Sequence, residues 1–258
     1  MTPYKGRVAI FTSFYSFQAY APYCISLAQT LGVLSKLGID WDYLARPSDF
    51  HIERAINNTL TELIEHGGFT DVLLIDSDES WEPEGVVRLL MHPQEIVAAT
   101  YRMKNNPKEY VGSPVYDEDG DIRGKVLPDG TALIAAERVA AGFLRIRLDA
   151  LKRYMAAYPN LWSDEPDGRK FQFFQRAPIQ QDDGSTVMGC QDMVFSKRWR
   201  DIGGELWIDP TVKVGHWWME CHQGDFDKHL RAKSQMSQAK EAFAVVAAMA
   251  KERAVANG

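Results

Sequence analysis

Residues 71–79, DVLLIDSDE, run four large aliphatic side chains straight into three carboxylates within four positions. A short uninterrupted aliphatic block between two breaks is typical of a fully buried parallel strand. Ligands of open parallel sheets bind beyond the carboxyl ends of the strands, because loops converge there without disturbing the core. The stretch therefore predicts a buried strand that delivers Asp76, Ser77 and Asp78 to a binding edge.

Asp76 and Asp78 are separated by a single residue. Two carboxylates placed in this way at a strand end can share a hard divalent cation, with phosphate oxygens or waters completing the shell. Without a cation they would repel each other, which raises the pKa of at least one of them. The alternative is that Asp78 caps the helix beginning near Pro83, or that the acids simply end the strand and face water. The stretch alone leaves both interpretations open.

The first hundred residues alternate short β-prone runs with segments of helical periodicity. This alternation is typical of right-handed βαβ units. It predicts an α/β fold, a three-layer α/β/α sandwich with a mostly parallel, Rossmann-like central sheet. The expected strands are 7–12, 39–44, 71–75 and 95–101, and two expected helices are 22–37 and 82–93. A third expected helix has apolar residues at helical spacing from Ile52 to Ile64, is capped at Ser48 or Asp49 and is stopped by Gly67 and Gly68.

The second half is less regular. Asp-Gly and Gly-Ser turn chemistry predicts β-hairpin insertions at 116–125 and 180–189. Other expected elements are a strand at 141–148, helices at 149–158 and 191–204, a strand, turn and strand over 206–218, and an Ala-rich helix at 237–256. No repeat or linker is evident, so we expect one domain over 1–230, followed by a C-terminal helix over 231–258 that packs on the sheet or forms a homodimer.

Composition places the chain among ordinary globular proteins, with 45% hydrophobic and 25% charged residues in a length of 258. The sequence has no apolar run approaching about 18 residues and no signal-peptide pattern at its start, so we expect a cytoplasmic protein without a membrane segment. Cys24, Cys190 and Cys221 are odd in number and far apart, which fits a reducing compartment and no common zinc site. The net charge of -6 gives no footprint for tight binding to a nucleic-acid backbone.

Four signals in one order resemble the glycosyltransferases of the GT-A fold, which use a nucleotide-diphosphate sugar and usually Mn²⁺ or Mg²⁺. The resemblance covers the chain from Arg7 to Trp218. The signals are DSD at 76–78, like the family's Asp-X-Asp; Ala141-Gly142 in AAGFLRI, like its glycine-containing loop near the acceptor and donor sugar; Gln191-Asp192, like its Glu-Asp pair; and His216 in VKVGHWW, like its C-terminal metal-binding histidine.

The resemblance implies a role for each residue. Asp78 and His216 would hold the cation that stabilises the departing diphosphate. Asp76 would reach the ribose or a metal-bound water and so belongs to both the metal and the substrate set. Asp192 is the candidate general base. Gln191 replaces the family's commoner Glu, which leaves the acceptor contact less defined.

Further contacts are expected around the donor. Thr12 or Ser13 would meet the base or ribose at the end of the first strand. Arg54, with Asn58 one turn later, resembles the family's Arg-Asn segment near the nucleotide, although a solvated helix face is the alternative. Arg102 and Lys104 would meet the diphosphate or acceptor, or are surface charges. Trp217 would stack on a sugar ring, but it and His216 are also compatible with ordinary core positions.

The sequence thus predicts a metal-dependent enzyme, a hexosyltransferase that moves sugar from a UDP-sugar to a hydroxyl acceptor. One alternative is a sugar-nucleotide-forming nucleotidyltransferase, which would usually carry a Gly-rich basic loop after the first strand, whereas residues 11–20 contain neither glycine nor a basic residue. The other is a non-catalytic nucleotide- or sugar-binding module. The acceptor is open among a saccharide, a protein, a metabolite and a modified DNA base, and so is the stereochemistry.

Overall fold

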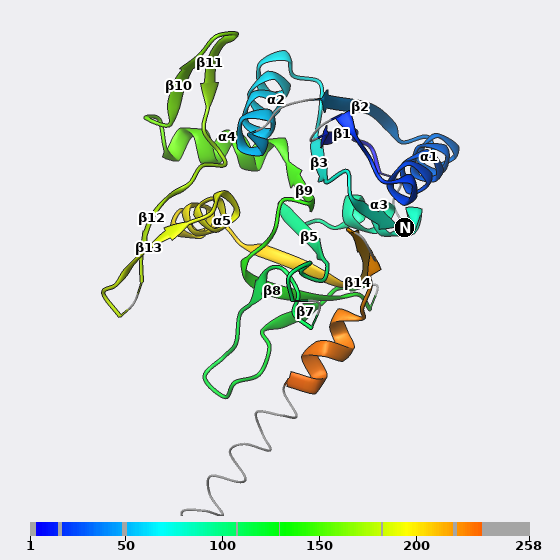
Figure 1. Cartoon of the computed structure of the whole chain (residues 1–258), viewed down its shortest axis with the longest axis vertical. Coiled ribbons are helices and arrows are strands. Elements are labelled where there is room, and N and C mark those ends of the chain that lie inside the picture. Colours follow the sequence, from blue (N-terminus) through cyan, green and yellow to red (C-terminus); the bar gives the residue numbers. More distant parts are fainter. Residues whose placement is uncertain are drawn as a thin grey trace, which may run out of the picture.

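The computed structural model describes residues 4–14, 17–47, 51–106, 108–128, 130–181, 183–218 and 221–233. Its centre is a mixed sheet (Figure 1) with the main strand order β2-β1-β3-β9-β5-β14-β8-β6, in which β8 is Ala132–Arg138 and β6 is Ser113–Pro114. β2, β1, β3, β5 and β14 run in one direction, and β9 is antiparallel between β3 and β5. These six strands are β1 (Arg7–Phe14), β2 (Asp40–Pro47), β3 (Asp71–Ile75), β5 (Ile96–Thr100), β9 (Phe143–Arg147) and β14 (Leu206–Trp217).

Helices cover both faces of the sheet. Alternate residues of β3 enter two separate hydrophobic clusters, Val72 and Leu74 on one face and Leu73 and Ile75 on the other. The first cluster is closed by α2, α4 and α5, and the second by α1 and α3. The predicted three-layer sandwich is confirmed, because a strand that is apolar on both faces must be covered twice. The helices are α1 (Ala21–Lys36), α2 (Ile52–His66), α3 (Pro83–Met91), α4 (Leu148–Ala157) and α5 (Gln191–Asp201).

Short strands extend the sheet and form two small hairpins. The hairpin predicted at 180–189 is β12 paired with β13, and the one predicted at 116–125 contributes a Tyr116–Ile122 bridge and β7, which pairs with β8. The β10–β11 hairpin was not expected. These strands are β4 (Glu79–Trp81), β6 (Ser113–Pro114), β7 (Gly124–Val126), β8 (Ala132–Arg138), β10 (Trp162–Glu165), β11 (Gly168–Phe171), β12 (Ala177–Gln180), β13 (Thr186–Gly189) and β15 (Cys221–His222).

The expectation of two strands and a turn over 206–218 was wrong. β14 is a single strand that changes register between Ile208 and Lys213. The Asp209-Pro210 step interrupts the ladder without reversing the chain. There Asp209 accepts hydrogen bonds from the Thr211 backbone N–H (2.9 Å) and hydroxyl (2.6 Å). The strand therefore continues past the irregularity and carries His216 to the edge of the sheet where β3 ends.

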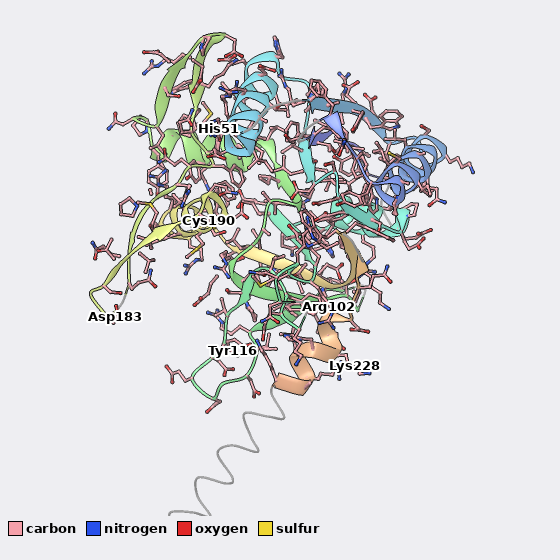
Figure 2. All side chains as sticks on the ribbon, in the orientation of Figure 1. His51, Arg102, Tyr116, Asp183, Cys190 and Lys228 are labelled. Atoms are coloured by element: carbon pink, nitrogen blue, oxygen red, sulfur yellow. The ribbon has the colours of Figure 1, made fainter. Side chains whose placement is uncertain are left out.

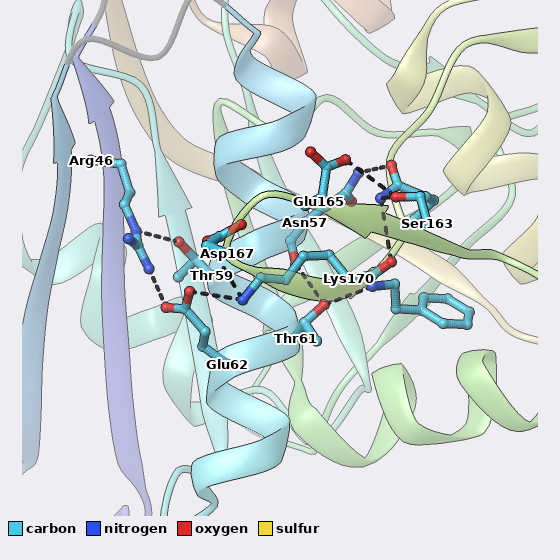
Figure 3. Close-up of polar contacts among 11 residues, drawn as sticks. Arg46, Asn57, Thr59, Thr61, Glu62, Ser163, Glu165, Asp167 and Lys170 are labelled. Carbon is cyan, nitrogen blue, oxygen red and sulfur yellow. Dashed lines mark hydrogen bonds and ion pairs between the residues drawn. The ribbon is translucent and has the colours of Figure 1, made fainter.

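The polar face of α2 is partly buried, which the sequence did not indicate. Asn57 is fully buried, donates to the Phe174 carbonyl at 2.7 Å and accepts from the Phe174 backbone N–H at 2.8 Å. Thr61 accepts from the Phe171 N–H at 3.0 Å. Lys170 adds an ion pair to Glu62 at 3.3 Å (Figure 3). This face therefore docks the chain that follows α4 onto the first half of the fold.

Residues 226–233 are helical and include position 231, where the C-terminal helix was expected to start. The predicted helix at 237–256 lies outside the described residues. Among the described helices, none has both the length and the apolar composition to cross a membrane.

Candidate active site

The turn after β3 is fixed by backbone hydrogen bonds from segments that are distant in the sequence. The Asp76 N–H donates to the Gly142 carbonyl at 2.9 Å, and the Trp217 N–H donates to the Asp78 carbonyl at 2.7 Å. β4 then turns back to pair antiparallel with β14, which places Glu79 opposite His216. The acids of DSDE therefore lie between Gly142, which directly precedes β9, and Trp217, which ends β14.

Asp78 and His216 meet at this edge. The Nε2 atom of His216 lies 3.8 Å from Asp78 Oδ1. Its Nδ1 lies 2.8 Å from the Arg102 carbonyl oxygen, which can only accept, so in the neutral ring Nδ1 carries the proton and Nε2 the lone pair. A backbone carbonyl that orients an imidazole in this way is typical of metal-binding histidines. The structure thus brings the two residues together as the sequence predicted.

Asp78 also has a cationic partner. The ammonium of Lys104, from the segment after β5, forms an ion pair with Asp78 Oδ2. It lies 5.4 Å from the centroid of the Trp218 ring, which is 58% exposed. The two oxygens of Asp78 therefore face different groups, one the imidazole and the other the ammonium.

Glu79 belongs to the cluster, although sequence reasoning gave it no role. It is fully buried, and neither of its carboxylate oxygens forms a hydrogen bond of normal geometry with any described residue. Burial, followed by the charges of Asp76 and Asp78, raises the pKa of Glu79 well above its usual value, while the Tyr101 hydroxyl acts against this rise. The signal was present in the sequence as the third acid of DSDE.

Gly142 lies against the same groups. A Cβ atom at this position would lie 2.1 Å from the Tyr101 hydroxyl, and 2.7 Å from both Asp76 Oδ2 and Glu79 Oε1. Any side chain would displace these three polar groups. The glycine predicted near the donor sugar is thus required by the close approach of the backbone to the acids.

Asp192 approaches from the second residue of α5. Burial raises the pKa of Asp192 to about 6, against a hydrogen bond from the Ala141 backbone and the charge of Arg138. Its Oδ1 atom is buried without a hydrogen-bond partner among the described residues. Burial, followed by the charges of Asp78 and Asp192, also raises the pKa of Asp76 to about 7. These carboxyl groups are therefore close enough to influence one another.

The side chains fit a divalent cation in part. Carboxylate and imidazole are donors that suit Mn²⁺, and the buried Asp78 Oδ1 has no hydrogen-bond partner within the described part of the chain. Asp76 does not complete a close set with Asp78 and His216, since the described residues contain no group of three or more His, Cys, Asp or Glu that could hold a metal ion. A cation here would take two protein ligands and complete its shell with phosphate or water oxygens.

The remaining predicted residues differ in exposure. Thr12 is fully buried, and its hydroxyl lies 2.6 Å from that of Tyr23, so it points into the core. The Ser77 carbonyl accepts from the Tyr20 N–H at 3.1 Å. The indole of Trp217 donates to Ser80 at 2.8 Å. Elsewhere, Ser13 is 8% exposed, Arg54 is exposed in the first turn of α2, Asn58 is half-buried one turn later, and Gln191 begins α5 directly after Cys190 (Figure 2).

No family model matches the chain, and no curated protein matches it. Among solved structures it is similar to the A197 protein of STIV (16% identity, TM-score 0.46, 82% of this chain and 86% of that chain). It is also similar to GalNAc-T7 crystallised with UDP, GalNAc and Mn²⁺ (12%, 0.42, 83% and 44%) and to S. aureus TarS 1-349 (11%, 0.41, 78% and 57%). The chain thus spans less than two thirds of the second and third of these proteins.

Proposed function

We propose that the protein is a glycosyltransferase that moves a hexose from a UDP-sugar to a hydroxyl acceptor, with Mn²⁺ or Mg²⁺ on the diphosphate. The observation that carries the proposal is the meeting of Asp78 and His216 beside the buried acid Asp192. His216 comes from the end of a strand distant in the sequence, and its Nε2 atom lies 3.8 Å from the strand-end carboxylate of Asp78. A cation bound to the donor diphosphate would account for the proximity of these two side chains.

Asp78 and His216 would hold the cation, which when bound neutralises the negative charge that builds up on the departing diphosphate. The Arg102 carbonyl keeps His216 in the tautomer that this task requires. Asp76 would orient the ribose or a water molecule of the shell. Gly142 would keep the backbone close to Tyr101, Asp76 and Glu79, because a side chain at this position would displace these groups.

Asp192 would act as the general base. Its unpaired Oδ1 takes the proton of the acceptor hydroxyl while the acceptor oxygen forms a bond to C1 of the sugar, and the bond between C1 and the diphosphate oxygen breaks. A pKa of about 6 suits this role, because the carboxylate is ionised at neutral pH and still accepts a proton readily. Thr12, Ser13, Arg54, Asn58, Ser77, Ala141, Gln191 and Trp217 remain predicted substrate contacts.

The test is calorimetric titration of UDP with and without Mn²⁺, together with release of UDP from UDP-glucose and UDP-galactose. We expect Mn²⁺-dependent binding that is lost in Asp78→Asn and His216→Ala and kept in Asp119→Asn, an exposed acid in the 117–121 turn. Slow release of UDP separates an enzyme from a binding module, because a module binds without turnover. Mn²⁺-independent binding, or no binding of any common nucleotide sugar, would overturn the proposal.

A further inference from the structure

Lys104 pairs with the same carboxylate that would hold a metal ion. Its ammonium pairs with Asp78 Oδ2, while Asp78 Oδ1 faces the lone-pair nitrogen of His216. The lysine side chain is 28% exposed, and it passes close to the open face of Trp218. An ammonium paired with one oxygen of a candidate metal-binding carboxylate is more than a surface charge.

The surroundings explain why the ammonium stays there. Asp76 and Glu79 lie together, since an oxygen of each would lie 2.7 Å from a Cβ atom at Gly142, and the ammonium of Lys104 pairs with the neighbouring Asp78. The buried Glu79 carboxylate has no hydrogen-bond partner of normal geometry among the described residues. A positive charge at this edge is therefore needed whether or not a divalent ion is bound.

The lysine and a divalent cation cannot use Asp78 in the same way at once. Two cations on one carboxylate repel each other, and the repulsion is strong where water is partly excluded. The long flexible stem of a lysine lets its head group move by rotation of side-chain bonds alone. Once released, the ammonium would find its nearest new anion in the diphosphate that the metal ion carries.

We propose that Lys104 is a displaceable counterion: it neutralises Asp78 while no metal ion is bound, and it transfers to a phosphate oxygen of the donor when the metal–nucleotide complex enters. The inference rests on the proposed function and extends it to the order of binding. Mn²⁺ alone competes with the lysine, whereas Mn²⁺ with UDP gives the lysine a second partner. The metal ion and the nucleotide therefore bind cooperatively, and Lys104 is one source of the coupling.

The experiment compares wild type with Lys104→Met, which keeps the length of the side chain and removes its charge. Mn²⁺ binding without nucleotide is measured by electron paramagnetic resonance, from the signal of the free ion. UDP binding is measured by calorimetry at saturating Mn²⁺. We expect Lys104→Met to bind Mn²⁺ about 10-fold more tightly and UDP about 10-fold more weakly, which follows from losing one charge contact in each state. Lys104→Arg keeps the charge and should stay near wild type.

Lys108→Met is the matched control, because Lys108 is exposed in the same segment, and it should change neither constant. The proposal is overturned if Lys104→Met binds Mn²⁺ no more tightly than wild type, or if UDP binds wild type equally well in EDTA. Equal Mn²⁺ binding by wild type and Lys104→Met that disappears in Asp78→Asn would reject the counterion and leave the proposed function standing. Absence of Mn²⁺ binding in all of these proteins would reject both.

Discussion

The two ends of β14 hold acids under opposite conditions. Near its start, Asp209 is fully buried and accepts hydrogen bonds from His92 at 2.9 Å and Arg88 at 3.0 Å, besides those from Thr211. At its far end, His216 faces a group of acids in which Glu79 is equally buried and lacks a partner of normal geometry in the described structure. The same strand therefore supports one complete polar network and one incomplete one.

The pKa values of the acids in the two networks are shifted in opposite directions. Burial alone would raise the pKa of Asp209, but the hydrogen bonds from His92 and Thr211 and the charge of Arg88 outweigh it and lower the pKa to about 2. Burial raises the pKa of Asp192 to about 6. Burial is thus common to both, and pairing decides the outcome. Buried acids with incomplete pairing in a cluster are typical of functional sites, whereas a complete network is typical of structural support.

The largest effect should follow from breaking the complete network. Asp209→Ala leaves His92 and Arg88 without their shared acceptor, and we expect a loss of about 3 kcal/mol in the free energy of unfolding. Urea unfolding monitored by tryptophan fluorescence measures it. Asp149→Ala, which removes an exposed pair with Lys152, should cost less than about 1 kcal/mol. A loss below about 1 kcal/mol in Asp209→Ala would show that its network is not structural.

Changing the incomplete cluster should alter chemistry before stability. Asp192→Asn removes the proton acceptor and keeps the shape, so donor binding should persist while UDP release falls by roughly 10²-fold or more. Calorimetry with UDP and Mn²⁺ gives the first quantity, and initial rates with UDP-glucose or UDP-galactose give the second. Parallel loss of binding and rate would assign Asp192 to the donor site instead.

Gly142→Ala tests how tightly the cluster packs around the backbone. The new methyl group would displace Tyr101, Asp76 and Glu79, so we expect a cost of about 1–3 kcal/mol in stability and weaker donor binding. Gly32 lies in α1 with open space around its Cβ direction, so Gly32→Ala should stabilise the protein by about 0.5–1 kcal/mol. Thermal unfolding compares the stability of the two variants. An unchanged stability of Gly142→Ala would mean that the acidic side chains can move aside for the methyl group.

The smallest effect should be on how stability depends on pH, to which Asp192 and Asp209 contribute with opposite signs. A folded-state pKa raised to about 6, as for Asp192, contributes stability that is present below about pH 4 and lost as pH rises through 6. The lowered pKa of Asp209 contributes stability that is present above about pH 4 and lost as pH falls towards 2. Urea unfolding from pH 3 to 8 should therefore show a shallower decline above pH 4 in Asp192→Asn. An unchanged profile would place the titration elsewhere.

Local sequence predicted most of the regular elements because periodicity reports burial directly. The aliphatic run before Asp76 indicated a strand covered on both faces, and the amphipathic spacing of α2 and α3 indicated two helices. The direction of β9 was not readable, since an apolar strand looks the same when it is parallel or antiparallel to its neighbours. The burial of Asn57 was missed for a related reason: a polar helix face gives no sign of whether water or another backbone will satisfy it.

The sequence by itself determined most of the strands and helices of the first hundred residues, and that acids follow a buried strand. Only the tertiary structure decided that Glu79 is buried without a partner of normal geometry in the described chain, that Lys104 reaches Asp78, and that His216 arrives with its Nδ1 already engaged. The physical reason is that burial periodicity is a local property of the chain, whereas the state of a carboxylate depends on groups that arrive from distant segments.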